Sequence, residues 1–365
     1  MRILICPDKF KGSLSAAAAA RAIERGVRRA LPRAEVQRMP LADGGEGSME
    51  LLGRAYGLRA HRLRVTGPLR KPVRATYYLG GGRAVIESAA ACGLHLVPPP
   101  RRDPGETTTI GVGMLLEEAL SRGARDILLL LGGSATNDCG AGMAAALGYR
   151  FFTASDADIV PTGASLQYID RIDTEHRNPA LASARITVLC DVNNPLLGPH
   201  GATYTYARQK GAREDQLDEL EENVRHFSEL LIRDVGAHVA GIPGSGAAGG
   251  LGAGALAFLG AKLRSGAEVI LEAVGFSEAA ASADLVITGE GSIDEQTLHG
   301  KVVAGVTAAG RRTLAVCGRS TLAAGALGVE AILSFDRFTQ LTIAEKMDRA
   351  AGLLEEVVYD YLARI

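Results

Sequence analysis

The stretch that decides the fold is Leu128–Met143, which reads LLLLGGSATNDCGAGM. Its four leucines form an unbroken apolar run, which is typical of a strand buried on both faces of a parallel sheet. Gly132 and Gly133 end this strand, and an alanine-rich helix is expected over about residues 140–147. The stretch therefore predicts a strand, a turn and a helix in direct succession.

The turn of this unit carries small side chains that form hydrogen bonds, namely Ser134, Thr136, Asn137 and Asp138. In a parallel sheet, such a turn lies at the carboxyl end of its strand, where ligands bind. Glycine lets the backbone approach an anion closely, and N–H groups at the start of the next helix can hold it. We predict a phosphate-binding turn. The alternative is an ordinary turn that uses Gly for positive φ and Ser or Asp as an N-cap.

The same pattern of a buried strand followed by a polar, glycine-containing loop recurs along the chain. Other predicted strands cover Arg2–Cys6, Glu35–Leu41, Arg185–Cys190 and Asp284–Thr288. The polar residues at the strand ends are Asp8 with Lys9, Asp43 with Glu46, Asn137 with Asp138, Asp191, and Glu290 with Asp294. Because parallel strands end at one edge of a sheet, we expect these side chains to line a ligand cleft.

The chain is predicted to form two α/β domains. Residues 61–97 alternate polar and apolar side chains as antiparallel strands do, and the pattern changes near Val65–Pro68. The strand–helix units after residue 265 are similar to those at the start. We predict that residues 1–67 and 265–365 form a doubly wound, Rossmann-like or flavodoxin-like parallel-sheet domain. Residues 68–264 would form an inserted mixed α/β domain, with the active site in the cleft between the two.

Composition excludes several classes of protein. A length of 365 residues suits about two domains, and the net charge is -1 with no Trp, which argues against nucleic acid or anionic membrane as a partner. The five cysteines are odd in number and scattered, so we expect free thiols in a reducing compartment. No apolar run reaches transmembrane length. We expect a cytoplasmic protein, either a monomer or a homodimer.

Carboxylates beside glycine loops suit Mg²⁺ bound to a polyphosphate, because Mg²⁺ takes one or two carboxylates and completes its shell with phosphate oxygens and water. The reaction class would be phosphoryl transfer. The chain has neither a Walker A sequence nor the motifs of protein kinases. Lysine is scarce beside arginine, yet Lys9, Lys11, Lys210 and Lys301 lie in glycine-rich motifs, where a compact ammonium suits phosphate.

The segment Gly244–Gly249 reads GSGAAG, the spacing of a dinucleotide-binding fingerprint, with Glu268 about twenty residues further on. That fingerprint requires a firm strand immediately before it, and only a short apolar stretch broken by Pro243 precedes this one. Glu268 also comes before an apolar run and not at its carboxyl end. We therefore reject the dinucleotide interpretation, although the glycines could still contact phosphate.

Seven ordered motifs resemble the type I glycerate kinase family. They are PDKFKGSLSA, PLADGGEGS, VTGPL, GGSATNDCGAGM, CDVNNPLLGPHGAT, PGSGAAGGLGAG and ADLVITGEGSIDEQTLHGK. The resemblance implies ATP-dependent phosphorylation of D-glycerate to 2-phosphoglycerate, a two-domain α/β fold, and Mg²⁺ as the companion of the nucleotide. Two departures concern the loops. Cys139 stands where the family usually has Gly, and residues 206–210 read YARQK where the family pattern is nearer to FGPQK.

The polar residues at the strand ends and the family resemblance together give hypotheses for the roles of individual residues. Asp191 is expected to orient the glycerate hydroxyl as the base, and Lys9 to neutralise developing charge. The residues expected to contact the substrate are Asp8, Lys11, Ser13, Asp43 and Lys210. The residues expected to contact the nucleotide are Gly132, Gly133, Ser134, Thr136, Asn137, Gly246 and Gly249. Glu290 and Asp294 are the expected Mg²⁺ ligands. Ser13 is also the expected N-cap of the first helix. The alternatives are that Asp191 caps a turn and that Asp294 is an N-cap.

Three other functions are less favoured alternatives to this interpretation. They are a kinase acting on a different small hydroxy acid, an NAD-dependent oxidoreductase that uses Gly244–Gly249, and a metabolite-binding protein without activity. The residues alone do not decide between phosphorylation at the 2-position and the 3-position.

Overall fold

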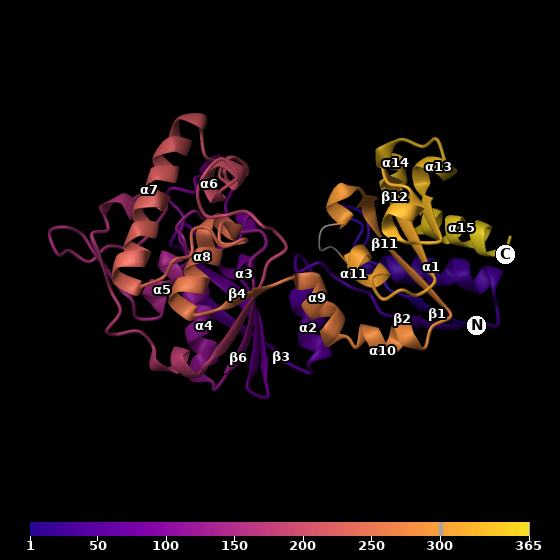
Figure 1. Cartoon of the computed structure of the whole chain (residues 1–365), viewed down its shortest axis with the longest axis horizontal. Helices are drawn as coiled ribbons and strands as arrows, with labels where there is room; N and C mark the ends of the chain where they lie inside the picture. Colours follow the sequence, from indigo (N-terminus) through magenta and orange to yellow (C-terminus); the bar gives the residue numbers. More distant parts are fainter. Residues whose placement is uncertain (299–301, 365) are drawn as a thin grey trace. The chain divides into compact units, whose positions relative to one another are not determined.

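The computed structural model describes residues 1–298 and 302–364. The chain divides into two compact units, Met1–Leu52 with Ser265–Ile365, and Gly53–Arg264. The first unit is built from both ends of the chain, which are indigo and yellow in Figure 1. Each unit is a mixture of helices and a largely parallel sheet, so the predicted α/β class is confirmed.

The first unit contains a five-stranded sheet in which every pairing is parallel. In spatial order its strands are β13 (Ala331–Ser334), β12 (Thr313–Ser320), β11 (Leu285–Ile293), β1 (Arg2–Ile5) and β2 (Glu35–Arg38). Counted along the chain, this order is 2-1-3-4-5, the flavodoxin-like arrangement, in which ligands bind where the winding direction reverses. Here that point lies between β1 and β11.

Helices cover both faces of this sheet. On one face, α1 (Ala16–Ala30) and α15 (Ala350–Leu362) enclose a buried cluster around Ile5, Ile287 and Val316. On the other face, α11 (Val302–Thr307) and α12 (Ala324–Leu327) contribute to a smaller cluster. The remaining helices of this unit are α9 (Gly266–Ala273), α10 (Phe276–Ala281), α13 (Phe335–Phe338) and α14 (Ile343–Asp348), while α2 (Ser48–Ala55) crosses the division between the units.

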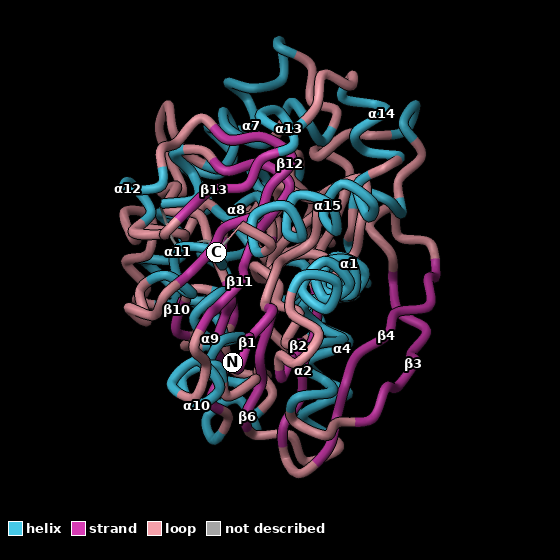
Figure 2. The backbone as a smooth tube through the Cα atoms, turned by 90° about the vertical axis from the view of Figure 1, so that its right-hand side faces the viewer, coloured by secondary structure: helices cyan, strands magenta, loops and turns pink. Residues whose placement is uncertain are grey.

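The second unit contains a six-stranded mixed sheet. Its strands, in spatial order, are β10 (Lys262–Arg264), β9 (Arg185–Leu189), β6 (Asp126–Leu130), β5 (Arg83–Glu87), β4 (Pro72–Gly80) and β3 (Arg59–Thr66). The first four are parallel, whereas β3, β4 and β5 pair antiparallel as predicted. Figure 2 shows β3 and β4 side by side as a long hairpin.

One large apolar cluster forms the core of the second unit, and it includes the fully buried rings of Tyr77, Phe151 and Phe227. The helices of this unit are α3 (Ala89–Cys92), α4 (Ile110–Ser121), α5 (Ala141–Ala146), α6 (Ala202–Tyr206), α7 (Leu217–Leu230) and α8 (Ala247–Leu259). A separate two-stranded sheet pairs β7 (Arg150–Phe152) with β8 (Arg171–Asp173). No helix in residues 1–298 and 302–364 is long and apolar enough to span a membrane.

The first division of the chain differs from the predicted one. It falls between Leu52 and Gly53, and not near residue 67. The reason is that β3 pairs with β4 along its whole length, from Arg59 opposite Leu79 to Thr66 opposite Pro72. Backbone pairing therefore assigns β3 to the second unit, whereas the change of sequence pattern comes only after it.

Two local expectations were also wrong. The strand predicted to end at Thr288 continues to Ile293, because it pairs with β12 as far as Ser320 and Gly289 lets its backbone lie close to that strand. A Cβ atom on Gly289 would lie 2.0 Å from the carbonyl oxygen of Val316. The N-cap of α1 is Ser15, whose Oγ accepts a hydrogen bond from the Ala18 N–H, whereas Ser13 Oγ donates to the Met347 carbonyl.

The packing of α1 on α15 predicts opposite effects for one substitution at two glycines. A Cβ on Gly26 would lie 2.4 Å from the Glu355 carbonyl oxygen, but a Cβ on Gly352 would meet nothing within 4 Å. Gly26→Ala should therefore destabilise the protein by about 1–3 kcal/mol despite the better helix propensity of Ala. Gly352→Ala should stabilise it by about 0.5–1 kcal/mol. Urea unfolding measures both, and equal signs would contradict the close helix contact.

Candidate functional site

Charged side chains meet in the first unit at the carboxyl ends of β1 and β2. Lys9 Nζ lies 2.7 Å from Asp43 Oδ1 and 3.9 Å from Asp8 Oδ1. The Asp8 N–H donates to the carbonyl oxygen of Gly289 in β11, so the chain after β1 continues alongside that strand. These residues therefore lie at the reversal point of the sheet, where the fold predicts a ligand. We call Asp8, Lys9, Asp43 and Glu290 the acidic cluster.

The electrostatics of the acidic cluster show an excess of negative charge. Burial raises the pKa of Asp8 to about 7, and the charges of Asp43 and Glu290 add to this effect against the opposing charge of Lys9. Burial alone would lower the pKa of Lys9, but Asp8 and Asp43 outweigh it and raise that pKa. The bond from Lys9 likewise outweighs the burial of Asp43, whose pKa is lowered. Several carboxylates of this kind are hard oxygen donors of the type that Mg²⁺ prefers.

The two predicted metal ligands have different surroundings. Glu290 lies within β11, and its Oε1 accepts a hydrogen bond of 2.8 Å from Thr297 Oγ1. Asp294 Oδ1 accepts a bond of 3.0 Å from the Gln296 N–H at the start of a short 3-10 helix, Glu295–Leu298. Asp294 therefore has the capping contact that was its alternative interpretation, while Glu290 acts electrostatically on Asp8.

Lys11 and Ser13, two further predicted residues of the first unit, do not join the acidic cluster through any described hydrogen bond. Lys11 is exposed in the turn before α1. Ser13 is bound to the Met347 carbonyl at 2.7 Å. Lys301 lies outside the described residues.

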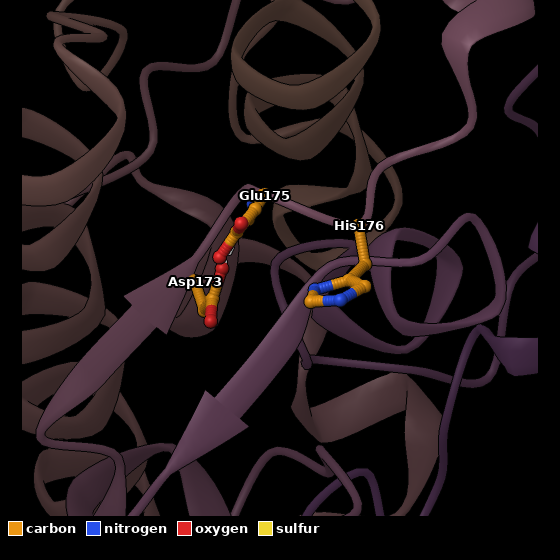
Figure 3. A group of neighbouring side chains, drawn as sticks. All are labelled: Asp173, Glu175 and His176. Atoms are coloured by element: carbon orange, nitrogen blue, oxygen red, sulfur yellow. Dashed lines mark hydrogen bonds between the residues drawn. The ribbon is translucent and has the colours of Figure 1, made fainter.

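Another group of potential metal ligands lies in the second unit. Asp173 at the end of β8 and Glu175 and His176 on the turn that follows offer ligand atoms within 4.8 Å of one another (Figure 3). Asp173 Oδ1 already accepts the Glu175 N–H at 2.8 Å, which is an ordinary turn contact. None of the three is a residue that the sequence assigned to a site.

The predicted phosphate-binding turn follows β6 in the second unit. Gly132 and Gly133 are exposed, and Gly133 has a φ of +78°, whereas Ser134, Thr136 and Asn137 are buried. Across the described parts of the chain, the backbone N–H groups of Gly133, Ser134, Thr136 and Asn137 find no acceptor. A row of free N–H donors after a strand is a site for an anion. We call residues 132–137 the anion turn.

Neighbouring segments hold the anion turn by hydrogen bonds to its other groups. Lys210 Nζ donates to the Thr136 carbonyl at 2.7 Å and to Ser134 Oγ at 3.2 Å. Ser134 Oγ donates in turn to the Ala248 carbonyl at 3.0 Å. Thr107 Oγ1 donates to the Ala135 carbonyl at 2.8 Å. The turn is thus anchored through its carbonyls, the Ser134 hydroxyl and the Ala135 N–H, which donates to the Cys92 carbonyl, and the four other N–H groups named above stay available.

Asp138, which directly follows the anion turn, has an anchoring role that the sequence did not reveal. It is fully buried and accepts hydrogen bonds from the N–H and Oγ1 of Thr109, at 2.7 and 2.8 Å, and from the Gly140 and Gly142 N–H groups. Burial raises its pKa even though these donors favour the charged form. Asp138 therefore ties the turn to the start of α4, and its carboxylate is occupied.

The glycine-rich segment packs against two turns and does not follow a strand within the described residues. A Cβ on Gly246 would lie 2.1 Å from the Pro195 carbonyl oxygen, and one on Gly249 would lie 1.9 Å from that of Thr136. Glu268 lies in the first turn of α9 and not at the end of a strand. The structure agrees with the rejection of the dinucleotide fingerprint, and it gives Gly249 a place directly behind the anion turn.

The remaining predicted residue of the second unit, Asp191, is exposed immediately after β9. Close to it, Asn194 organises the next loop: its carbonyl accepts the Gly244 and Gly246 N–H groups, and its Oδ1 accepts a bond of 2.6 Å from Tyr206. Sequence analysis did not select Asn194, because an Asn in a polar loop carries no distinguishing signal.

Cys139, which stands where the family pattern has Gly, has a backbone conformation that favours glycine. Cys139 has a φ of +51°, in the left-handed region that favours glycine, and it is fully buried. The Gly expected from the family pattern would adopt this backbone without strain.

A carboxylate–lysine cluster at the reversal point of one sheet and a turn of free N–H groups beside another are features of an α/β protein that binds phosphorylated ligands. The model of the glycerate kinase family matches residues 3–365. The chain belongs to the glycerate kinase family.

Individual relatives agree with this assignment. The chain is 44% identical to a protein named glycerate kinase from Bacillus subtilis (strain 168), with 100% of this chain and 98% of the relative covered. It is 46% identical to one named glycerate 2-kinase from Escherichia coli (strain K12), over 84% of this chain and 81% of the relative. A crystal structure described as a glycerate kinase 2 from Salmonella typhimurium LT2 matches with a TM-score of 0.86 and 41% identity, over 100% and 98% of the two chains.

The contact behind the anion turn predicts a large difference between two adjacent substitutions. Gly249 has a φ of +71°, and its Cα faces the Thr136 carbonyl, so Gly249→Ala should cost about 2 kcal/mol or more through overlap and backbone strain. Ala248 has a φ of +56°, so Ala248→Gly should relieve strain and stabilise the protein by up to about 1 kcal/mol. Thermal unfolding tests both. A neutral Gly249→Ala variant would disprove the close backbone contact.

The raised pKa of Asp8, about 7 in the folded protein against 3.8 ordinarily, predicts a specific pH dependence of stability. Between these two values the folded state binds more protons than the unfolded state, so stability falls as the pH rises from about 4 to 7. Asp8→Asn should remove this slope and stabilise the protein at pH 8 by roughly 2–4 kcal/mol in metal-free buffer.

Urea unfolding at several pH values measures this effect. Asp348→Asn, which changes an exposed acid on α14, is the matched control and should leave the slope unchanged. If Asp8→Asn shows the slope of the wild type, Asp8 is not protonated near neutral pH.

Proposed function

We propose that this protein is a glycerate kinase that transfers the γ-phosphoryl group of ATP to D-glycerate and forms 2-phosphoglycerate. The observation that carries the proposal is the match of the glycerate kinase family over residues 3–365, together with relatives named glycerate kinase and glycerate 2-kinase. The anion turn supports it, because its free N–H groups suit phosphate oxygens.

The proposed roles keep to the residues that the sequence selected. In the second unit, the anion turn would hold nucleotide phosphates, with Gly246 and Gly249 shaping its surroundings. Asp191 would accept the proton of the glycerate hydroxyl as the oxygen attacks the γ-phosphorus, and ADP would leave. Its position immediately after a buried strand supports this role.

In the first unit, Lys9 would neutralise negative charge of the reacting groups. Its two contacts, with Asp43 and Asp8, hold the ammonium in place. Asp8 and Asp43, together with Lys11 and Ser13, would orient the substrate. These assignments remain hypotheses that substitution can test.

Mg²⁺ is proposed as the companion of ATP. The acidic cluster suits it, because burial and the charges of Asp43 and Glu290 raise the pKa of Asp8, and a bound cation would favour the charged carboxylate. Glu290 is the proposed ligand with the clearest electrostatic link to this cluster, and Asp294 would contribute from the adjoining turn. When bound, the ion would neutralise phosphate charge.

A cytoplasmic location is also proposed, because all five cysteines are free.

The proposal is tested by a coupled assay with ATP, Mg²⁺ and D-glycerate, followed by identification of the product by NMR. Turnover of another hydroxy acid in preference to D-glycerate would contradict the substrate, and formation of 3-phosphoglycerate would contradict the position of transfer.

The role of Asp191 gives a separate prediction. Asp191→Asn removes the proton acceptor, so kcat should fall by about 10²–10⁴-fold while the protein remains folded. Asp215→Asn, which removes only an exposed ion pair with Arg213, is the control and should keep nearly full activity. Steady-state kinetics and circular dichroism measure both effects. Near-normal turnover of Asp191→Asn would show that another group is the base.

A further inference from the structure

Lys210 is a buried cation whose surroundings differ from those of an ordinary structural lysine. Its residue is only 3% exposed, and it ends the short 3-10 helix Arg208–Lys210. Its ammonium donates to the Thr136 carbonyl at 2.7 Å and to Ser134 Oγ at 3.2 Å. Among the described residues, no carboxylate lies close enough to form an ion pair with it. Burial of an ammonium without an ion pair is costly.

The other titratable groups around Lys210 do not neutralise it fully. They are Cys92, Asp138 and Cys139. Burial raises the pKa of Cys92 to about 12 and that of Cys139 well above its ordinary value, so both thiols are uncharged at neutral pH. The carboxylate of Asp138 is occupied by donors from Thr109, Gly140 and Gly142. Burial correspondingly lowers the pKa of Lys210 to about 8.

A residue that only links two loops does not need a charge, because a neutral side chain could donate hydrogen bonds to the same carbonyl and hydroxyl with a smaller desolvation penalty. The charge does matter to a ligand. The ammonium is fixed on the carbonyl side of a turn whose N–H groups at Ser134, Thr136 and Asn137 have no acceptor among the described residues. Donors and charge together form a positive site that an anion would compensate.

We propose that Lys210 is a positioning residue for nucleotide binding: its buried ammonium holds the anion turn in shape and supplies the positive charge that the phosphates meet through the turn. The inference rests on the proposed function, since it assumes that the anion is ATP, and it differs from the sequence expectation that Lys210 contacts the substrate directly. The phosphates touch the backbone N–H groups, and Lys210 acts through Ser134 and Thr136.

The first test compares Lys210→Met with Arg208→Met. Both remove a cation from the same short helix, but Arg208 is half-exposed and paired with Glu214 at 2.6 Å. Lys210→Met should raise the KM for ATP and the Kd for ATP, measured by calorimetry, at least about tenfold, as expected for loss of a buried charged donor. The KM for D-glycerate should change by less than about twofold, and Arg208→Met should resemble the wild type.

The second test uses pH. The charged form of Lys210 is present below its pKa of about 8 in the free enzyme, so kcat/KM for ATP should fall as the pH rises through this value. Because bound phosphate favours the ammonium, kcat should fall only at a higher pH. Lys210→Met should lack the alkaline fall in kcat/KM. A lysine that only links two loops would not make kcat/KM for ATP and kcat fall at different pH values.

The outcomes distinguish the inference from the proposed function. A wild-type enzyme that binds ATP but does not phosphorylate D-glycerate would refute the function alone, and the Kd comparison would still test Lys210. A folded Lys210→Met variant with unchanged KM and Kd for ATP would overturn the inference, as would a raised KM for D-glycerate with unchanged ATP affinity. If Lys210→Met does not fold, a wild-type kcat/KM for ATP that stays constant from pH 7 to pH 9 would overturn it.

Discussion

Parallel strand pairing is the constraint on which both candidate sites depend. In the first unit, β1 lies between β2 and β11, and all three run in the same direction. Residues that are far apart in the chain, such as Lys9 and Asp43, therefore meet where the strands end. In the second unit, β6 lies between β5 and β9, so the anion turn follows a central buried strand. Both candidate sites lie at the carboxyl ends of parallel strands, which is the edge of an α/β sheet where ligands bind.

The two sites treat charge in different ways. The acidic cluster concentrates carboxylates around one lysine, so it favours protons and cations, as the raised pKa of Asp8 shows. The Asp138 carboxylate beside the anion turn accepts hydrogen bonds from Thr109, Gly140 and Gly142, and the turn itself, residues 132–137, contains no carboxylate. It offers backbone N–H groups and the ammonium of Lys210 instead. A kinase needs both properties, because it must bind a phosphate and neutralise the charge that moves during transfer.

Close backbone packing makes the second site possible. Gly249 and Gly246 lie so near the carbonyls of Thr136 and Pro195 that any side chain would overlap them. This contact fixes the anion turn from behind without using its N–H groups. The same segment that resembles a dinucleotide fingerprint in sequence therefore has another physical purpose here. The glycines allow three loops to approach one another, and in the described chain no strand leads directly into Gly244.

Local patterns predicted most of the elements, because burial and turn formation leave a signal within a few residues. The buried leucines Leu128–Leu130 of β6 and the alternation in β3 and β4 appear in the structure as expected. The predictions were wrong where pairing with a strand distant in sequence determines the structure more than the local pattern does. β11 continues through Gly289 and Gly291 because β12 pairs with it, and β3 belongs to the second unit because β4 pairs with it. Ser13 is not the cap, because α1 begins at Ala16 and Ser15 directly precedes it.

The sequence by itself determined the α/β class, the order of the strands and turns, and, through its ordered motifs, membership of the glycerate kinase family. Only the tertiary structure decided what each polar residue does. It placed Asp43 against Lys9, gave Asp294 a capping contact and enclosed Lys210 behind Ser134 and Thr136. The physical reason is that burial, charge and hydrogen-bond partners depend on residues brought together by folding, such as Lys210 and Thr136, which are 74 positions apart. No local pattern contains that information.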